Sequence, residues 1–151
     1  MTGVLAGSGS GHARSRFRVI PFDGEQEALV MGGDLDITVR SERGIVIAAV
    51  TGEIDISTVA QLRECLFGLA DNGGTLIVDL NRVTFIDSAG LAALVGTARR
   101  AAAHGGSVHA VCYRPQTRRL LWMTGVDRRI PLAATVDGAL MFHAASRGGR
   151  S

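Results

Sequence analysis

Residues 76–80 read Leu-Ile-Val-Asp-Leu, and residues 83–91 read Val-Thr-Phe-Ile-Asp-Ser-Ala-Gly-Leu. The first run is rich in β-prone apolar side chains, which is typical of a parallel strand that is buried on both faces. Asp87 and Ser88 are residue types favoured at helix starts, and apolar side chains follow them at helical spacing. This part of the chain therefore predicts a strand, a short connection and a helix that begins at Asp87 or Ser88.

Strand and helix patterns alternate on both sides of this segment. Strands are expected at residues 35–39, 45–50, 75–80 and 107–112, with a short edge strand at 130–132. Helices are expected after Thr58, which makes a capping-box pattern with Gln61, after Asp87, from Pro115 and from Thr135. This alternation implies right-handed crossovers between parallel strands. The predicted fold is one α/β domain over residues 34–145, with a mixed, mostly parallel sheet and helices packed on it.

The two ends of the chain lack this pattern. Residues 1–33 contain many glycines, a small basic patch and an acidic stretch, without the sustained period of a strand or a helix. Such a composition buries too little apolar surface to offset the entropy lost on ordering. We therefore expect a flexible N-terminal arm over residues 1–33, in which residues 17–22 dock locally at most, and a flexible tail over residues 146–151.

The composition suits one compact core, in which we expect the single tryptophan, Trp122. The chain has 151 residues, 46% of them hydrophobic, and no apolar run approaches the roughly 20 residues that cross a bilayer. The glycine-rich start lacks the apolar segment of a signal peptide, so we expect a cytoplasmic protein without membrane association.

Charge and metal-ligand patterns exclude several classes of function. The net charge is only +2, and the arginine pairs at 99–100, 118–119 and 128–129 lack the interleaved aromatic residues of nucleic-acid-binding surfaces. We expect these arginines on a solvated face and no nucleic-acid partner, although arginine also suits ion pairs across a protein interface. Cys65 and Cys112 lie in apolar stretches, which favours buried thiols over a disulfide.

The histidines are scattered singly along the chain, at His104, His109 and His143 among others, and none neighbours a cysteine at metal-ligand spacing. We expect neither a metal nor a cofactor.

Two interpretations of Asp87 and Ser88 remain open. As a helix cap, the pair needs no further function. Gly90 favours a functional site, because a glycine in the first helical turn lowers helix stability and often marks a close approach to the backbone. A hydroxyl between a strand end and a helix start also lies where free N–H groups favour an anion. Asp55 and Ser57 have the same ambiguity, since they also lie where a helix needs caps.

Residues 76–91 resemble the signature of STAS domains, in particular that of the anti-sigma factor antagonists. Gly-Glu-Ile-Asp at 52–55 resembles the family's loop after its second strand. Leu-Leu-Trp-Met-Thr-Gly-Val-Asp at 120–127 is similar to the family's later helix and turn. These motifs occur in the family's order without a large gap, so the resemblance supports a STAS-like fold.

The resemblance implies a switch at Ser88. In this family the partner anti-sigma factor is itself a serine kinase that phosphorylates the matching serine, and a serine phosphatase removes the phosphate. The unphosphorylated protein binds the anti-sigma factor and thereby frees a sigma factor for transcription. Asp55 and Asp87 match acidic positions near that switch. The residues expected to bind the partner are Asp55, Ser57, Asp87, Ala89, Gly90 and Leu91.

Two alternatives account for parts of the sequence. A hydrolase nucleophile elbow needs glycine two residues before its serine, where this chain has Ile86, so we expect a binding protein and no enzyme. A STAS domain can also serve as a regulatory subunit of a transporter or of a stress-sensing assembly without a kinase cycle. The presence of Ser88 and the single-domain size favour the antagonist.

Overall fold

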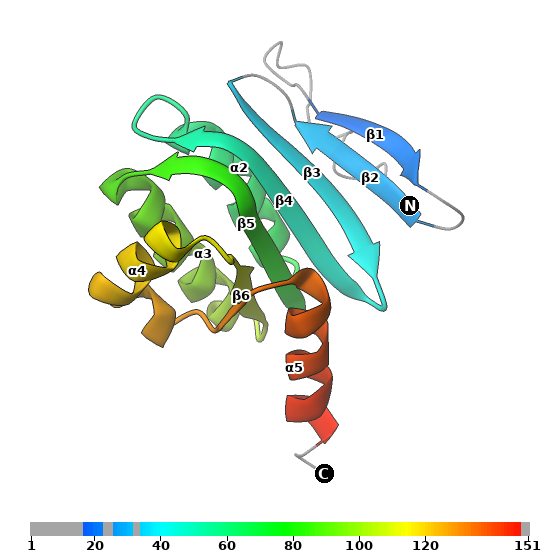
Figure 1. Ribbon diagram of the computed structural model, residues 1–151. Helices are drawn as coiled ribbons and strands as arrows, with labels where there is room; N and C mark the ends of the chain where they lie inside the picture. Colours follow the sequence, from blue (N-terminus) through cyan, green and yellow to red (C-terminus); the bar gives the residue numbers. More distant parts are fainter. Residues whose placement is uncertain (1–16, 23–25, 32–33, 149–151) are drawn as a thin grey trace.

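The structure is a computed structural model that describes residues 17–22, 26–31 and 34–148 (Figure 1). The described strands form one seven-stranded sheet, in which they neighbour one another in sequence order. The strands are β1 (Phe17–Phe22), β2 (Gln26–Met31), β3 (Leu35–Glu42), β4 (Ile45–Ile54), β5 (Thr75–Ile86), β6 (Ser107–Val111) and β7 (Leu132–Ala133). The helices are α2 (Val59–Ala70), α3 (Ser88–Ala103), α4 (Pro115–Met123) and α5 (Val136–Gly148), with a short 3-10 helix, η1 (Val126–Arg128).

The sheet is mixed, as the sequence predicted. Three antiparallel pairs join β1 to β2, β2 to β3 and β3 to β4. Three parallel pairs join β4 to β5, β5 to β6 and β6 to β7. Parallel neighbours need a crossover, and α2, α3 and α4 supply it after β4, β5 and β6. The predicted α/β class with helices packed on the sheet is confirmed.

The main core lies between the sheet and the helices α2 and α3, which cover one of its faces (Figure 1). Val78 on β5, Leu66 on α2 and Leu94 on α3 are at most 1% exposed, and burying each such side chain contributes about 1.5–3 kcal/mol. Cys65 and Cys112 are free thiols in this core, as predicted. Burial raises the pKa of Cys65 to about 12, so its thiol is neutral and unreactive at pH 7.

A smaller core lies on the opposite face of the sheet, where α5 packs. Ile47, Ile77 and Val111 from three neighbouring strands contact Ala139 and Leu140 of the helix. The helix continues to residue 148, past the predicted domain boundary at 145. None of the helices in the described ranges is long and apolar enough to span a membrane.

The N-terminal segment differs from the flexible arm expected over residues 1–33. The structure has β1 and β2 as an antiparallel hairpin, and β2 continues the sheet by pairing with β3 from Leu29↔Val39 to Met31↔Ile37. The physical reason is backbone pairing, because β3 would otherwise be a long edge strand with unpaired N–H and C=O groups. The remaining residues of the expected arm, and residues 149–151 of the expected tail, lie outside the described ranges.

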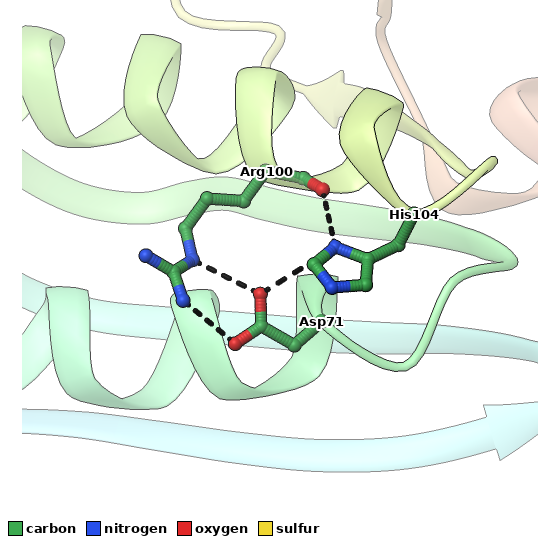
Figure 2. Close-up of polar contacts among 3 residues, drawn as sticks. All are labelled: Asp71, Arg100 and His104. Carbon is green, nitrogen blue, oxygen red and sulfur yellow. Dashed lines mark hydrogen bonds and ion pairs between the residues drawn. The ribbon is translucent and has the colours of Figure 1, made fainter.

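An ion pair joins the C-terminal ends of α2 and α3 (Figure 2). Arg100 donates two hydrogen bonds to Asp71, from Nε to Oδ1 at 3.0 Å and from Nη2 to Oδ2 at 2.7 Å. Its guanidinium also lies over the Phe67 ring, 4.7 Å from the ring centre. His104 Nδ1 lies 3.8 Å from the same carboxylate. The Arg100 hydrogen bond is the main cause that holds the pKa of Asp71 below its ordinary value, with the nearby Arg100 and His104 charges as smaller causes and desolvation opposing them.

We expect Asp71→Asn to lower the free energy of unfolding at pH 7. The lowered pKa means that the ionised carboxylate stabilises the fold above its unfolded pKa of about 3.9, and that this contribution is lost as the pH falls through the lower folded value. Urea unfolding should therefore separate wild type and variant at pH 7, and the difference should disappear as the pH falls from about 4 through the lower folded pKa of Asp71. Asp36→Asn, which changes an exposed carboxylate on β3, is the control and should have little effect at either pH. An equal loss for both variants would contradict the role of the ion pair.

Candidate functional site

The carboxyl ends of β4 and β5 lie side by side and carry the two predicted acidic residues. Ile54 pairs with Ile86 at the last position of both strands. The Asp87 N–H extends this pairing by donating to the Ile54 carbonyl at 3.1 Å. Asp55 and Asp87 are thus the first residues beyond two adjacent parallel strands. The structure brings their loops together at the carboxyl ends of these strands.

Asp87 is the N-cap of α3, which begins at Ser88 as the sequence predicted. Its Oδ1 accepts hydrogen bonds from the Ala89 N–H at 2.9 Å and from the Gly90 N–H at 3.2 Å. These bonds satisfy two of the free backbone donors of the first turn and place a negative charge at the positive end of the helix dipole. The capping interpretation of Asp87 is therefore confirmed, and it holds the Ser88 backbone in one position.

Asp55 organises the loop between β4 and α2. Its Oδ1 accepts hydrogen bonds from the Ser57 hydroxyl at 2.7 Å, the Ser57 N–H at 2.9 Å and the Thr58 N–H at 3.2 Å. The Ser57 hydroxyl is the main cause that lowers the pKa of Asp55, followed by the Ser57 N–H, with the Thr58 bonds adding to the effect and desolvation opposing it. The carboxylate is fully ionised at neutral pH.

The capping box predicted for Thr58 and Gln61 is wrong. The Thr58 hydroxyl donates to the Glu53 carbonyl at 2.8 Å and accepts from the Asp55 N–H at 3.0 Å, so it closes the loop instead of capping the helix. The Gln61 side chain donates to the Leu35 carbonyl on β3. The Gln61 side chain thus binds a distant strand instead of the helix start that the capping-box pattern predicts.

Two exposed apolar side chains flank the acidic loops, and the sequence reasoning missed both. Ile56, between Asp55 and Ser57, is 78% exposed, and Phe85 is 51% exposed. Register shifts between β4 and β5 explain Phe85, because each adds one residue on β5 and changes which side chains face the core. The core-facing residues of this part of β5 are consequently Leu80, Val83 and Ile86, three residues apart instead of two.

Ser88 is exposed, and within the described part of the chain its hydroxyl has no hydrogen-bond partner. Ala89 is half-buried beside it. Gly90 and Leu91, which were also expected to bind a partner, are buried in the first turn of α3. A Cβ on Gly90 would lie 2.5 Å from Ile54 Cγ2 and 2.7 Å from Ile86 Cγ1, so the close approach that this glycine marks is to the sheet. Both residues therefore lie beneath the surface of the protein.

In the described part of the chain, His104, His109 and His143 contact groups other than Ser88. His104 follows the last residue of the 16-residue helix α3, about 24 Å from Ser88. His109 is buried against α5, where its ring stacks edge-on with Phe142 and His143. Among the residues that the structure describes, no group of three His, Cys, Asp or Glu side chains could hold a metal ion.

The family model of the STAS domain matches residues 36–139, and the chain belongs to this family. The chain is 34% identical over 119 residues to the anti-sigma-F factor antagonist RsfB of Mycobacterium tuberculosis, covering 77% of this chain and 93% of that protein. It is 30% identical over 107 residues to the anti-sigma-B factor antagonist of Bacillus subtilis, covering 71% and 98%. The crystal structure of an anti-sigma factor antagonist from Mycobacterium paratuberculosis aligns with a TM-score of 0.66 at 31% identity, covering 71% of this chain and 92% of that one.

We expect Gly90→Ala to destabilise the protein although alanine favours helices. The new methyl group clashes with both isoleucines under α3, and such overpacking costs about 1–3 kcal/mol, more than the roughly 0.5–1 kcal/mol gained in helix propensity. Gly68→Ala on α2 is the matched control, because nothing lies within 4 Å of its new Cβ, and it should stabilise the protein. Urea unfolding followed by circular dichroism measures both. Gly90→Ala at or above wild-type stability would show that α3 does not rest on the sheet at this glycine.

Proposed function

We propose that this protein is a cytoplasmic anti-sigma factor antagonist with Ser88 as its phosphorylation switch. The unphosphorylated form binds an anti-sigma factor that is also a serine kinase, and this binding releases a sigma factor. Phosphorylation of Ser88 ends the binding, and a serine phosphatase restores it. The observation that most supports the proposal is the Ser88 hydroxyl beside two fixed acidic loops, which is exposed and has no hydrogen-bond partner among the described residues. The names of the antagonist relatives agree with it.

The partner contacts a region that we call the Ser88 surface. Its residues are Asp55, Ile56, Ser57, Phe85, Asp87, Ser88 and Ala89. Two exposed apolar side chains beside carboxylates suit a protein interface, because the apolar groups supply affinity on desolvation and the charges select a partner with basic groups. Gly90 and Leu91 support this surface from beneath and do not contact the partner.

Ser88 suits phosphorylation better than the neighbouring Ser57. The Ser57 hydroxyl donates to Asp55 at 2.7 Å, so a kinase would have to break this bond and place a phosphate against a carboxylate. Within the ranges that the structure describes, the Ser88 hydroxyl has no such bond to break. Its position at the start of α3 also leaves it accessible to the active site of another protein.

The phosphate blocks the interface directly in this proposal. A phosphoserine carries about −1.5 to −2 charges at neutral pH. The Ala89 and Gly90 N–H groups, which would otherwise bind it, already donate to Asp87. The phosphate therefore stays on the surface beside a carboxylate, where a partner has to desolvate it. Burying a charge without a matching partner costs several kcal/mol, whereas the fold itself has no reason to change.

We expect the cognate anti-sigma kinase and ATP to add one phosphate, at Ser88. Ser88→Asp should weaken binding of the anti-sigma factor by about tenfold or more, which is about 1.4 kcal/mol, whereas Ser88→Ala should bind like wild type and resist inactivation. Mass spectrometry locates the phosphate, and titration calorimetry measures the affinities. A major phosphate on Ser57 or Thr58, or amide-exchange changes across the whole sheet after phosphorylation, would overturn the proposed site or mechanism.

We expect Ile56→Ala to weaken binding of the same anti-sigma factor by about tenfold. The side chain is 78% exposed in the free protein, and its burial at an interface contributes about 1.5–3 kcal/mol. Met141→Ala on α5 is the matched control, since it removes a side chain that is 70% exposed elsewhere. Equal affinities for both variants would show that Ile56 is not part of the interface. They would not affect the proposal that Ser88 is the phosphorylation site.

A further inference from the structure

A second cluster of exposed apolar side chains lies on and beside α4. Tyr113, Trp122 and Met123 are 58%, 67% and 64% exposed. The sequence prediction that Trp122 lies in the core is therefore wrong. Leu121 is the only residue of α4 that is buried, because the helix turns a single narrow stripe toward the core and the neighbouring positions face away from it.

Tyr113 and Trp122 border a shallow hollow that is also lined by arginine. The hollow has a volume of about 550 Å³ and is lined by Tyr113, Trp122, Arg118, Arg119 and Leu132, with one carboxylate, Asp127. Arg118 is fixed there because its Nη1 donates to the Cys112 carbonyl at 2.7 Å. We call this region the α4 surface. Residues 113–129 carry five arginines and one aspartate, so its charge is strongly positive.

The α4 surface is separate from the Ser88 surface. The Tyr113 N–H donates to Asn81 Oδ1 at 2.8 Å, which places the start of the α4 surface beside the middle of β5. From Asn81 to Asp87 the strand runs six residues further, at most about 20 Å at 3.3 Å per residue and less across its register shifts. The two surfaces also differ in charge, because one carries arginines and the other carries Asp55 and Asp87. They therefore suit partners of opposite charge.

The composition of the α4 surface favours a protein partner. The hollow is too open to enclose most of a small ligand, as binding sites for small molecules do. Tryptophan, tyrosine and arginine are the residues most enriched at the energetic centres of protein interfaces. The chain's own terminal segments outside the described ranges do not complement the charge, since residues 1–16 contain Arg14 and Arg16 and neither these nor residues 149–151 contain Asp or Glu.

We propose that the α4 surface is a second docking surface, which binds an acidic segment of a protein partner whatever the phosphorylation state of Ser88. An apolar side chain of that segment packs between the Trp122 and Tyr113 rings, and its carboxylates pair with Arg118 and Arg119. This proposal goes beyond the anti-sigma factor interface and does not depend on it. It gives the protein two independent binding surfaces.

The test uses a random library of 12-residue peptides selected on the full-length protein, with Arg119→Glu protein for counter-selection. We expect selected peptides with a negative net charge and at least one large apolar residue. Their binding, measured by fluorescence anisotropy of labelled peptide, should fall about tenfold or more in Trp122→Ala and Arg119→Glu, which is about 1.4 kcal/mol, and should weaken with salt. Because Trp122 is the only tryptophan, a shift of its emission reports directly on occupancy.

Two controls separate this surface from other effects. Arg63→Glu reverses an exposed arginine on α2 and should leave peptide binding unchanged, as should Ser88→Asp. Both α4 variants should unfold at the wild-type temperature, since the substituted side chains are exposed.

Four results would overturn the proposal. The first three are the absence of any selected peptide, selected peptides without an excess of Asp and Glu, and peptide binding that Arg119→Glu leaves intact. The fourth is that the peptides leave the Trp122 emission unchanged whereas a different ligand shifts it. The other occupants to be assayed are phosphatidylglycerol vesicles, oligo-thymidine, and a second copy of the chain detected by sedimentation at high concentration.

Discussion

The parallel pairing of β4 with β5 is the interaction on which the proposed Ser88 surface depends. It continues to the last residue of both strands, and the Asp87 N–H adds one more bond to the Ile54 carbonyl. The two loops that follow are thereby fixed next to each other. The missing side chain of Gly90 lets α3 begin directly on Ile54 and Ile86, so the position of Ser88 is set by the sheet itself. The rigid support thus holds the exposed Ser88 in one orientation.

The sequence predicted the parts of the fold that depend on local patterns. Buried parallel strands are continuous apolar runs, and Asp87 followed by Ser88 signalled the start of α3 correctly. The missed features depend on contacts between distant residues. The bulges that expose Phe85 arise from the register of β5 against β4, and the Gln61 side chain binds a carbonyl on β3. The composition of residues 26–31 likewise does not predict the pairing of β2 with β3.

The small net charge of +2 conceals a separation of charge on the folded protein. Carboxylates gather where β4 and β5 end, and arginines gather on and after α4. The sequence indicated a solvated face for the arginine pairs because they lack interleaved aromatic residues, and Arg119, Arg128 and Arg129 are indeed exposed. The fold also places each group of charges beside exposed apolar side chains, Ile56 and Phe85 in one case and Trp122 in the other. Charge beside apolar surface is the arrangement that selects a partner and then binds it.

The negative charge of the Ser88 surface restricts how a phosphate can act there. Asp55, whose pKa is lowered by Ser57, is ionised before any phosphorylation, and a partner suited to this surface is basic. Added negative charge would strengthen the attraction of such a partner at distances up to the Debye length of about 8 Å. Long-range electrostatics therefore cannot explain the proposed release, and a phosphate on Ser88 would have to act at contact, where it would prevent close packing on Ala89 and have to lose its hydration. The proposed switch would therefore raise the dissociation rate without lowering the association rate, because charge governs the encounter and contact governs the stability of the complex.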